Sequence, residues 1–238
     1  GSAIVKPDVD TIFEIGGQDS KYISLENGVV VDFEMNHACA AGTGSFLEEQ
    51  AQRLNISINN EFAELAFKSD APIKLGERCT VFMESDLLSY QQQGAETPEL
   101  VAGLAYSIVA NYLNRVVGRR KIGENICFQG GTAFNRAVVA AFEKVTGKSI
   151  AVPDHHEVTG ALGAASIAAE HMENLAAEKG RPAESKFRGI DNLAHAEYTV
   201  ESFTCEACSN SCKIKKVQIP GSDPLYYGSR CDRYNLKK

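Results

Sequence analysis

The sequence predicts an α/β domain that is followed by a small cysteine-rich module. Three observations carry this prediction. Strand-type runs near the N-terminus give way to alternating helical and strand patterns as far as about residue 179. A polar stretch of mixed charge at residues 180–196 then indicates a linker. Beyond the linker, four cysteines lie between residues 205 and 231.

Strand-type segments open the domain and return later in it. The first three are short, contain apolar or β-branched residues and are separated by glycine turns, so we expect an antiparallel meander. The later two strands have the apolar composition of buried strands and alternate with helical segments. The expected strands of the domain are 11–15, 21–25, 28–33, 125–129 and 149–152.

Helical periodicity fills the stretches between these strands. The longest pattern begins at a cap formed by residues 97–99. The expected helices are 44–54, 60–68, 84–93, 97–119, 135–146 and 159–179. In the terminal module, residues 197–204 and 214–218 are expected to form strands.

Composition narrows the class of function. The 238 residues carry a formal net charge of −7, which disfavours a nucleic acid or a membrane surface as partner. No apolar run reaches the length of a membrane span, and no signal peptide is visible. Seven cysteines without a secretion signal favour reduced thiols and a cytoplasmic location. Gly1 and Ser2 indicate a cloning scar, with residues 3–9 as a lead-in.

Cys39 and Cys79 are candidate metal ligands. Cys39 lies in the glycine-rich segment 36–45, just before a predicted helix, and Cys79 lies in segment 76–84. Helix N-termini stabilise anions, so these positions suit thiolates. The spacing has no fixed metal signature, and two buried, inert cysteines are the alternative. Cys127 lies in a predicted buried strand and is expected in the core.

Three segments rich in small residues can approach a nucleotide. Residues 16–20 form a hairpin tip, where glycine lets the backbone come close to a phosphate. Residues 129–135 join a buried strand to a helix start, which is a common place for an anion or a nucleoside. Residues 160–165 are the third segment. Each segment alone also fits a plain turn or a tightly packed helix.

In this order, the segments resemble the actin-like (ribonuclease H-like) ATPase fold. The resemblance is closer to one branch of that fold, the activators of 2-hydroxyacyl-CoA dehydratases in the BadF/BadG/BcrA/BcrD ATPase family. It covers residues 10–170 and rests on segments 14–21, 37–44, 76–82 and 130–135. The two cysteine-containing segments are specific to this branch.

The resemblance implies a homodimer with one [4Fe–4S] cluster at the subunit interface, held by Cys39 and Cys79 of each subunit. It also implies ATP or ADP with Mg²⁺. ATP hydrolysis would drive a low-potential electron to an iron–sulfur partner of the dehydratase or double-cubane type.

The resemblance further implies a set of nucleotide contacts. Those to phosphate are Gly16, Gly17 and Gln18, with Asp19 as the catalytic residue that binds Mg²⁺ through water. Those to adenosine are Gly130, Gly131 and Asn135, with Glu157 nearby. Gly42, Thr43 and Gly44 are implied to border the nucleotide.

The sequence departs from the family pattern at its start. No Asp-x-Gly-x-Thr/Ser phosphate hairpin precedes residue 10. We therefore expect residues 10–179 to be the second half of an activase ATPase domain from a longer, multidomain protein. ATP hydrolysis is not expected of this chain alone.

Residues 197–238 predict a four-cysteine metal-binding module. Cys205, Cys208, Cys212 and Cys231 are spaced C-x2-C-x3-C-x18-C. Four thiolates suit tetrahedral Zn²⁺, and a second [4Fe–4S] cluster accepts a three-plus-one arrangement, so both stay open. A module this small needs a metal to fold. Four unligated thiols are the remaining alternative.

Two other functions stay open on the sequence alone. One is a small-molecule kinase of the actin-like fold, which needs a carboxylate base facing a substrate cleft; no segment clearly supplies one. The other is a non-enzymatic, metal-stabilised module that binds a partner through its cysteine cluster.

Overall fold

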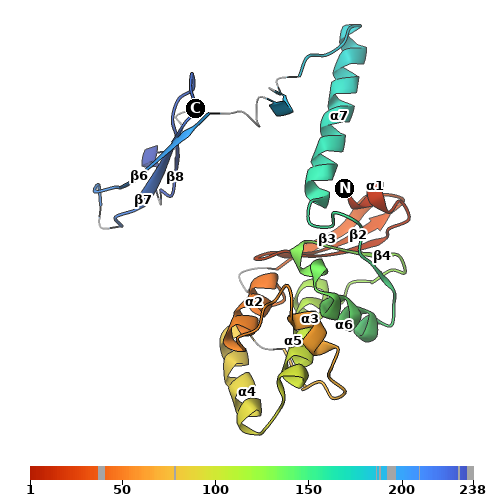
Figure 1. The fold of residues 1–238 in the computed structure, drawn as a ribbon. Helices are drawn as coiled ribbons and strands as arrows, with labels where there is room; N and C mark the ends of the chain where they lie inside the picture. Colours follow the sequence, from red (N-terminus) through yellow and green to blue (C-terminus); the bar gives the residue numbers. More distant parts are fainter. Residues whose placement is uncertain are drawn as a thin grey trace. The chain divides into compact units, whose positions relative to one another are not determined.

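The computed structural model describes residues 1–36, 41–77, 79–185, 187, 189–191, 197–208, 210–229 and 231–234. The chain divides into two compact units, Gly1–Asn174 and Leu175–Lys238. The division falls inside the long helix α7 (Thr159–Lys179), which Figure 1 shows.

A five-stranded mixed sheet forms the centre of the first unit, in the order β3-β2-β1-β4-β5. The first three strands are antiparallel, as expected, while β4 runs parallel to β1 and β5 runs parallel to β4. Because β1 and β4 are parallel neighbours, the turns that follow them emerge at the same edge of the sheet. The strands are β1 (Thr11–Ile15), β2 (Ser20–Glu26), β3 (Val29–Met35), β4 (Ile126–Gln129) and β5 (Ile150–Ala151).

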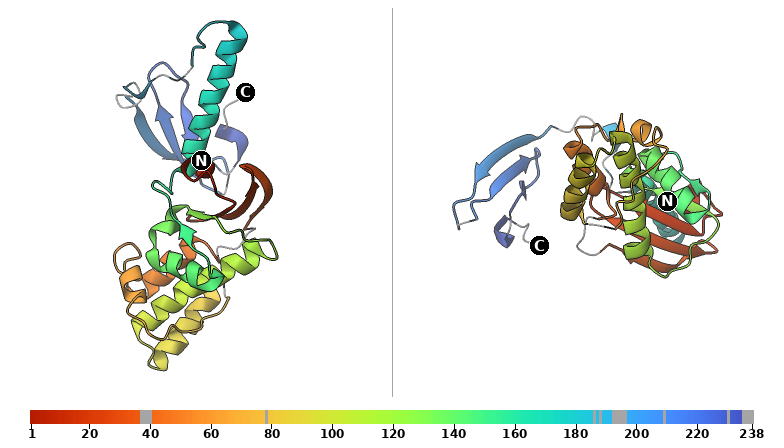
Figure 2. Two further views of the ribbon diagram at one scale, coloured as in Figure 1. Left: turned by 90° about the vertical axis from the view of Figure 1, so that its right-hand side faces the viewer. Right: turned by 90° about the horizontal axis from the view of Figure 1, so that it is seen from below.

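Five helices lie on one side of this sheet, while α1 (Ser2–Val5) and the start of α7 lie on the other (Figures 1 and 2). The five are α2 (Gly44–Arg53), α3 (Phe62–Ala66), α4 (Thr80–Gln92), α5 (Thr97–Tyr112) and α6 (Arg136–Thr146). α4 begins four residues before the expected position. Its first residues, Thr80 to Phe82, are weak helix formers, so the periodicity only becomes visible at residue 84.

Adjacent positions along β1 and β4 contribute to two separate cores. Phe13 and Phe128 belong to the large cluster shared with the five helices. Ile12 and Cys127 belong to a smaller cluster on the opposite face. This alternation is the period-two pattern of a sheet that is covered on both faces. The expected burial of Cys127 is confirmed, since its side chain is fully inaccessible.

The central helix α5 begins with a capping box between Glu96 and Glu99, and it continues into a π-helix, η1 (Leu113–Val117). The helix Thr97–Val117 is long and apolar enough to cross a membrane by length and composition, with a mean hydropathy of 1.3. No uninterrupted apolar run marks this helix in the sequence, because small and polar residues lie within it. In its most apolar stretch of 18 residues, 72% of the helix is buried inside the protein, so it has the character of a core helix.

The first residues are part of the fold rather than a loose lead-in. Ser2 is buried, and its hydroxyl donates a hydrogen bond to Oε1 of Gln129. A Cβ atom on Gly1 would lie 1.8 Å from the carbonyl oxygen of Thr159, so α1 packs tightly against the start of α7. Ala3 packs on the smaller cluster.

β3 forms one edge of the sheet and carries exposed apolar residues. The side chains of Val31 and Phe33 are about half exposed. The register pairs Phe33 with Ile23, and Ile23 with Ile12. Phe33 therefore lies on the same face of the sheet as the smaller cluster.

The second unit contains a three-stranded antiparallel sheet in the order β6-β7-β8. β6 (Thr199–Thr204) and β7 (Lys213–Gln218) match the expected strands. β8 (Leu225–Tyr227) and the 3₁₀ turn η3 (Asp232–Tyr234) were not expected, because each is only three residues long.

Candidate functional site

The tip between β1 and β2 is held against the first turn of α2. The main-chain N–H groups of Gly44 and Ser45 donate to the carbonyl oxygens of Gly16 and Gly17, both at 2.8 Å. Nε2 of Gln18 donates to Oγ of Ser45 at 2.7 Å. The predicted phosphate segment and the first turn of α2 are therefore joined through their backbones.

The turn after β4 packs on the same tip. Gly130 has φ +91°, and a Cβ atom there would lie 2.4 Å from the carbonyl oxygen of Ile15. The main-chain N–H of Gly130 donates to the carbonyl of His156 at 2.9 Å, and Nδ1 of His156 donates to the carbonyl of Gly130, also at 2.9 Å. A Cβ atom on Gly44 would lie 3.0 Å from Oγ1 of Thr132. The tip between β1 and β2, the start of α2 and the turn after β4 are far apart in sequence, and they contact one another through Gly16, Gly44 and Gly130.

A pocket of about 600 Å³ opens where these segments meet. Its volume lies within the range of about 300–1,000 Å³ that is typical of small-molecule sites. The lining comes from the hairpin tip, from α2 and the loop after it, from α3, and from η2 (Gly131–Phe134). The residues are Gly17, Gly44, Leu47, Glu48, Ile58, Asn59, Ala63, Gly131, Thr132, Phe134 and Asn135.

Asn135 combines a structural role with a free donor. Its Oδ1 accepts a hydrogen bond from the main-chain N–H of Ala137 at 3.1 Å and so caps α6. Its Nδ2 is buried and has no hydrogen-bond partner among the described atoms. A buried donor left unpaired beside a pocket is unusual, because most buried polar groups are satisfied. Asn135 lines the pocket, but because its Nδ2 is itself inaccessible, this atom can donate to a ligand only after the side chain moves.

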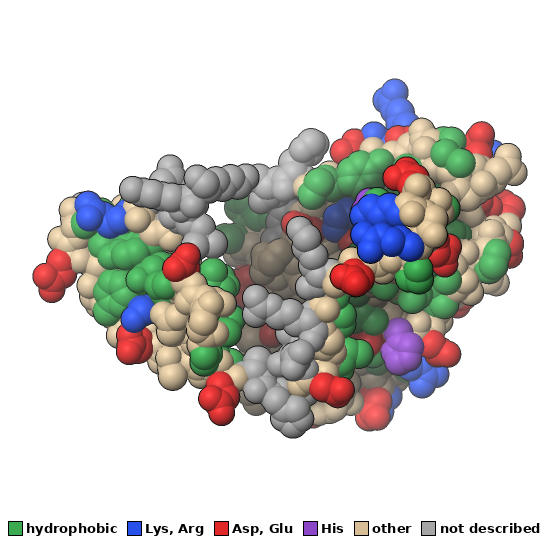
Figure 3. Space-filling view, turned by 90° about the horizontal axis from the view of Figure 1, so that it is seen from above, with side chains coloured by type: hydrophobic (Ala, Val, Ile, Leu, Met, Phe, Trp, Pro, Cys, Tyr) green, Lys and Arg blue, Asp and Glu red, His purple; other side chains and the backbone are tan. Residues whose placement is uncertain are grey.

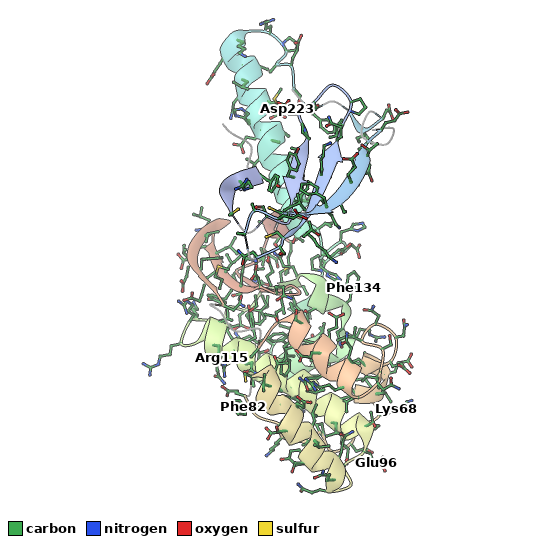
Figure 4. All side chains as sticks on the ribbon, turned by 90° about the vertical axis from the view of Figure 1, so that its left-hand side faces the viewer. Lys68, Phe82, Glu96, Arg115, Phe134 and Asp223 are labelled. Carbon is green, nitrogen blue, oxygen red and sulfur yellow. The ribbon has the colours of Figure 1, made fainter. Side chains whose placement is uncertain are left out.

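Phe134 and Glu48 line the pocket and were missed in the sequence. Phe134 is 65% exposed, and its ring lies 4.2 Å from that of His156 in an edge-on arrangement. Figure 4 labels Phe134 on η2. From the sequence alone, an aromatic residue in such a turn is expected in the core. The role of Phe134 in the pocket became visible only because the structure shows its ring exposed. Glu48 had no sequence signal beyond its place one turn after Gly44 in α2.

The predicted nucleotide residues fall into three groups. Gly17, Gly44, Gly131 and Asn135 line the pocket. Gly16 and Gly130 lie behind it, as the backbone contacts that hold the turns together. The others are not among the lining residues: Gln18, Asp19, Gly42, Thr43 and Glu157. Of these, Asp19 is exposed on the tip, while Thr43 is buried as the N-terminal residue before α2.

Cys79 lies at the start of α4. It is half-buried in an extended conformation, and its carbonyl accepts the main-chain N–H of Met83 at 3.0 Å. The neighbouring Val81 and Phe82 are exposed. Cys39 lies outside the described residues, so a site formed by Cys39 and Cys79 together stays a prediction.

α2 and α4 are joined by two contacts near the start of α4. Nε2 of Gln50, which is fully buried, donates to the carbonyl oxygen of Thr80 at 3.1 Å. Arg53 forms an ion pair with Glu84. Because the two contacts follow the same order along both helices, the helices run in the same direction. The helix that starts at the pocket therefore packs beside the helix that starts after Cys79.

The cysteines of the second unit do not form disulfides in this structure. The main-chain N–H of Cys205 donates to the carbonyl of Cys212 at 2.8 Å. A side-chain hydrogen bond with Cys205 raises the pKa of Tyr234 above its usual value. Within the described part of the chain, no three Cys, His, Asp or Glu side chains are grouped as a metal site. The predicted four-cysteine site stays a prediction.

Comparisons with known proteins agree with this geometry. The chain is similar to the (R)-2-hydroxyglutaryl-CoA dehydratase activating ATPase of Acidaminococcus fermentans, with 36% identity over 168 residues, which are 71% of this chain and 64% of that protein. The structure of component A of that dehydratase superposes with a TM-score of 0.65 at 35% identity, covering 68% of this chain and 62% of the other.

The activator of the 2-hydroxyisocaproyl-CoA dehydratase from Clostridium difficile, solved with bound ADPNP, superposes with a TM-score of 0.69 at 32% identity, covering 79% of this chain and 68% of the other. The fold is thus that of the actin-like ATPase of the dehydratase activators. The chain spans less than two thirds of the length of the A. fermentans sequence. Residues 1–168 match the sequence model of a single family. This chain belongs to the BadF/BadG/BcrA/BcrD ATPase family.

Proposed function

We propose that this chain is the nucleotide-binding part of an ATP-dependent activator. The activator gives a low-potential electron to an iron–sulfur protein of the 2-hydroxyacyl-CoA dehydratase or double-cubane type. The observation that carries the proposal is the pocket where Gly17, Gly44, Gly131 and Asn135 meet. The names of the relatives, and the ADPNP bound in one of them, support it.

The chemistry of the lining suggests how ATP or ADP would bind. The phosphates lie by Gly17, where glycine lets the backbone come close to an anion. The base lies against the exposed ring of Phe134, and Nδ2 of Asn135 donates to the nucleoside after the side chain moves. Glu48 accepts hydrogen bonds from the ribose hydroxyls. Asp19, exposed on the tip, is the proposed Mg²⁺ contact through water.

The same contacts connect the nucleotide to the proposed cluster ligands. The tip is hydrogen-bonded to the first turn of α2, and the segment that contains Cys39 directly precedes α2. Through Gln50, α2 contacts the first residue of α4, which follows Cys79. A movement of the tip on exchange of ADP for ATP would therefore reach the start of both helices. A bound [4Fe–4S] cluster supplies the one-electron chemistry.

The surroundings of Cys79 fit a thiolate ligand at a homodimer interface. The residue is half-buried at the start of a 13-residue helix, where the helix dipole favours negative charge. Val81 and Phe82 are 68% and 63% exposed beside it, so a second copy that covers this end of α4 would bury apolar surface. A cytoplasmic location, in which thiols stay reduced, is part of the proposal.

Anaerobic reconstitution with iron and sulfide tests the cluster. We expect about two irons per chain, because one four-iron cluster is shared by two chains. Cys39→Ser and Cys79→Ser should each abolish this iron, together with the dimer in sedimentation. Cys127→Ala, at a fully buried thiol, is the matched control and should retain it. Iron that persists in the Cys39→Ser, Cys79→Ser double variant, when the chain also carries Cys208→Ser and Cys231→Ser, would refute the bridging cluster.

Hydrogen exchange with Mg²⁺ and ADPNP tests the nucleotide site separately. We expect slower exchange at residues 16–19, 44–48 and 130–135, and unchanged exchange in the second unit. Protection confined to other segments would contradict nucleotide binding in this pocket, whatever the iron content of the protein.

A further inference from the structure

The second unit has very little hydrophobic core. Among its described residues, only Cys205 and Ile214 are buried. Val200, Phe203 and Tyr227 are exposed instead, and Figure 3 shows hydrophobic side chains gathered on the surface of this unit. Units of this size usually need a disulfide, a metal or another chain to stay folded. Its cysteines are not paired in disulfides.

Three of its four cysteines lie in one turn. β6 and β7 are paired as far as Thr204 and Lys213, so the turn between them runs from residue 205 to residue 212. Cys205 and Cys212 face each other at its base through their 2.8 Å backbone hydrogen bond. Cys208 is exposed at the end of the turn.

The segment that carries Cys231 returns to the same end of the sheet. A Cβ atom on Gly228 would lie 2.4 Å from the carbonyl oxygen of Lys213, the residue after Cys212. The ring of Tyr234, three residues beyond Cys231, lies 5.2 Å from that of Tyr226 on β8. The same ring lies 5.8 Å from that of Phe203 on β6. The chain on both sides of Cys231 therefore contacts the turn or its flanks.

We propose that Cys205, Cys208, Cys212 and Cys231 form a structural tetrathiolate Zn²⁺ site at this end of the sheet. Binding of Zn²⁺ by four thiols releases four protons and forms four Zn–S bonds, with no change of oxidation state. The thiol side chains must turn toward a common point on binding, since they are not grouped as a metal site in the structure described above. The bound ion replaces the missing core as the cross-link of the unit.

Exposure favours zinc over an iron–sulfur cluster here. Cys208 and Cys231 are both exposed, so a cluster would face solvent, whereas Zn²⁺ is redox-inert. Four thiolates around Zn²⁺ carry two net negative charges. Lys213 and Lys215 on β7 lie beside the turn and offset that charge.

Metal analysis of the full 238-residue chain, purified in air with Zn²⁺ present, tests the site. We expect about one zinc per chain and loss of that zinc in Cys208→Ser and in Cys231→Ser. Cys127→Ala, at a fully buried thiol of the first unit, is the matched control and should keep its zinc. Co²⁺ in place of Zn²⁺ should give the intense thiolate charge-transfer absorption of a tetrahedral site.

A folding measurement separates a structural metal from an adventitious one. Chelation of zinc should make residues 197–234 sensitive to protease and leave 1–174 resistant. Zinc that is retained in both variants would overturn the ligand set. Iron and acid-labile sulfide lost in the same variants would replace zinc by a cluster. A metal-free second unit that stays protease-resistant would overturn the structural role. None of these outcomes bears on Cys39 and Cys79.

Discussion

The main-chain N–H of Gly44 donates a hydrogen bond of 2.8 Å to the carbonyl oxygen of Gly16. This bond joins the first residue of α2 to the tip that follows β1. Gly130 closes on the same tip, against Ile15. Much of the candidate site is therefore built from backbone, and added side-chain atoms are sharper probes of it than deletions.

Gly130→Ala should destabilise the first unit. The new Cβ would lie 2.4 Å from the carbonyl of Ile15, and the backbone has φ +91°, so we expect a loss of about 2–4 kcal/mol. Gly131→Ala is the matched control, because its Cβ would meet nothing within 4 Å. Urea unfolding followed by circular dichroism measures both. Equal stability of the two variants would contradict the close approach of the turns.

Phe134→Ala should weaken nucleotide binding without unfolding the protein. The ring is exposed, so its loss costs little core, whereas stacking of a base on an aromatic ring contributes about 1–3 kcal/mol. We expect the Kd for Mg²⁺ and ADPNP to rise about tenfold in calorimetry. Phe82→Ala, at an equally exposed ring on α4, serves as the control (Figure 4). An unchanged Kd for Phe134→Ala would contradict stacking of the base on the ring of Phe134.

Gln50→Ala should loosen the start of α4. The change removes a buried donor and leaves the carbonyl of Thr80 without it, at a cost of about 1–3 kcal/mol. We expect faster alkylation of Cys79, measured by peptide mass spectrometry. Arg53→Ala removes the surface ion pair with Glu84 of α4 and a second one with Glu49 within α2, and it should change the rate little. If Arg53→Ala gave the larger effect, the buried hydrogen bond would not be the link.

Cys127 should make stability fall at high pH. Burial raises the pKa of its thiol to about 11, so between pH 9 and 11 the unfolded chain releases a proton that the folded chain keeps. Stability then decreases as pH rises through this range, by about 2 kcal/mol in total. Unfolding curves of the chain and of Cys127→Ala, compared from pH 8 to 11, isolate this contribution. Parallel pH profiles would contradict it.

The first three strands and most helices could be predicted because their signals are local. Alternating apolar residues and the glycine turns at residues 16 and 28 define β1 to β3 without knowledge of distant contacts. The start of α4 and the three-residue β8 could not be located in this way. The first depends on a packed partner, Gln50 of α2, and the second is stabilised only by its pairing with β7.

The glycine backbone of the site and Asn135 were predictable, whereas the side chains of Phe134 and Glu48 were not. Glycine-rich turns, which permit a close approach of the backbone, are visible in the sequence, so Gly17, Gly44 and Gly131 could be predicted. The exposure of Phe134 follows from how η2 turns away from the core, and the role of Glu48 follows from which face of α2 meets the tip. Both depend on tertiary packing.

The half-exposed Val31 and Phe33 on β3 have a practical consequence for handling this chain. An apolar edge strand presents unpaired backbone hydrogen-bonding groups together with exposed apolar side chains. This combination promotes pairing between strands of different molecules. Light scattering at increasing protein concentration would therefore report self-association that owes nothing to thiols. A lysine at position 31 would improve solubility while leaving the pocket, at the other end of β1, untouched.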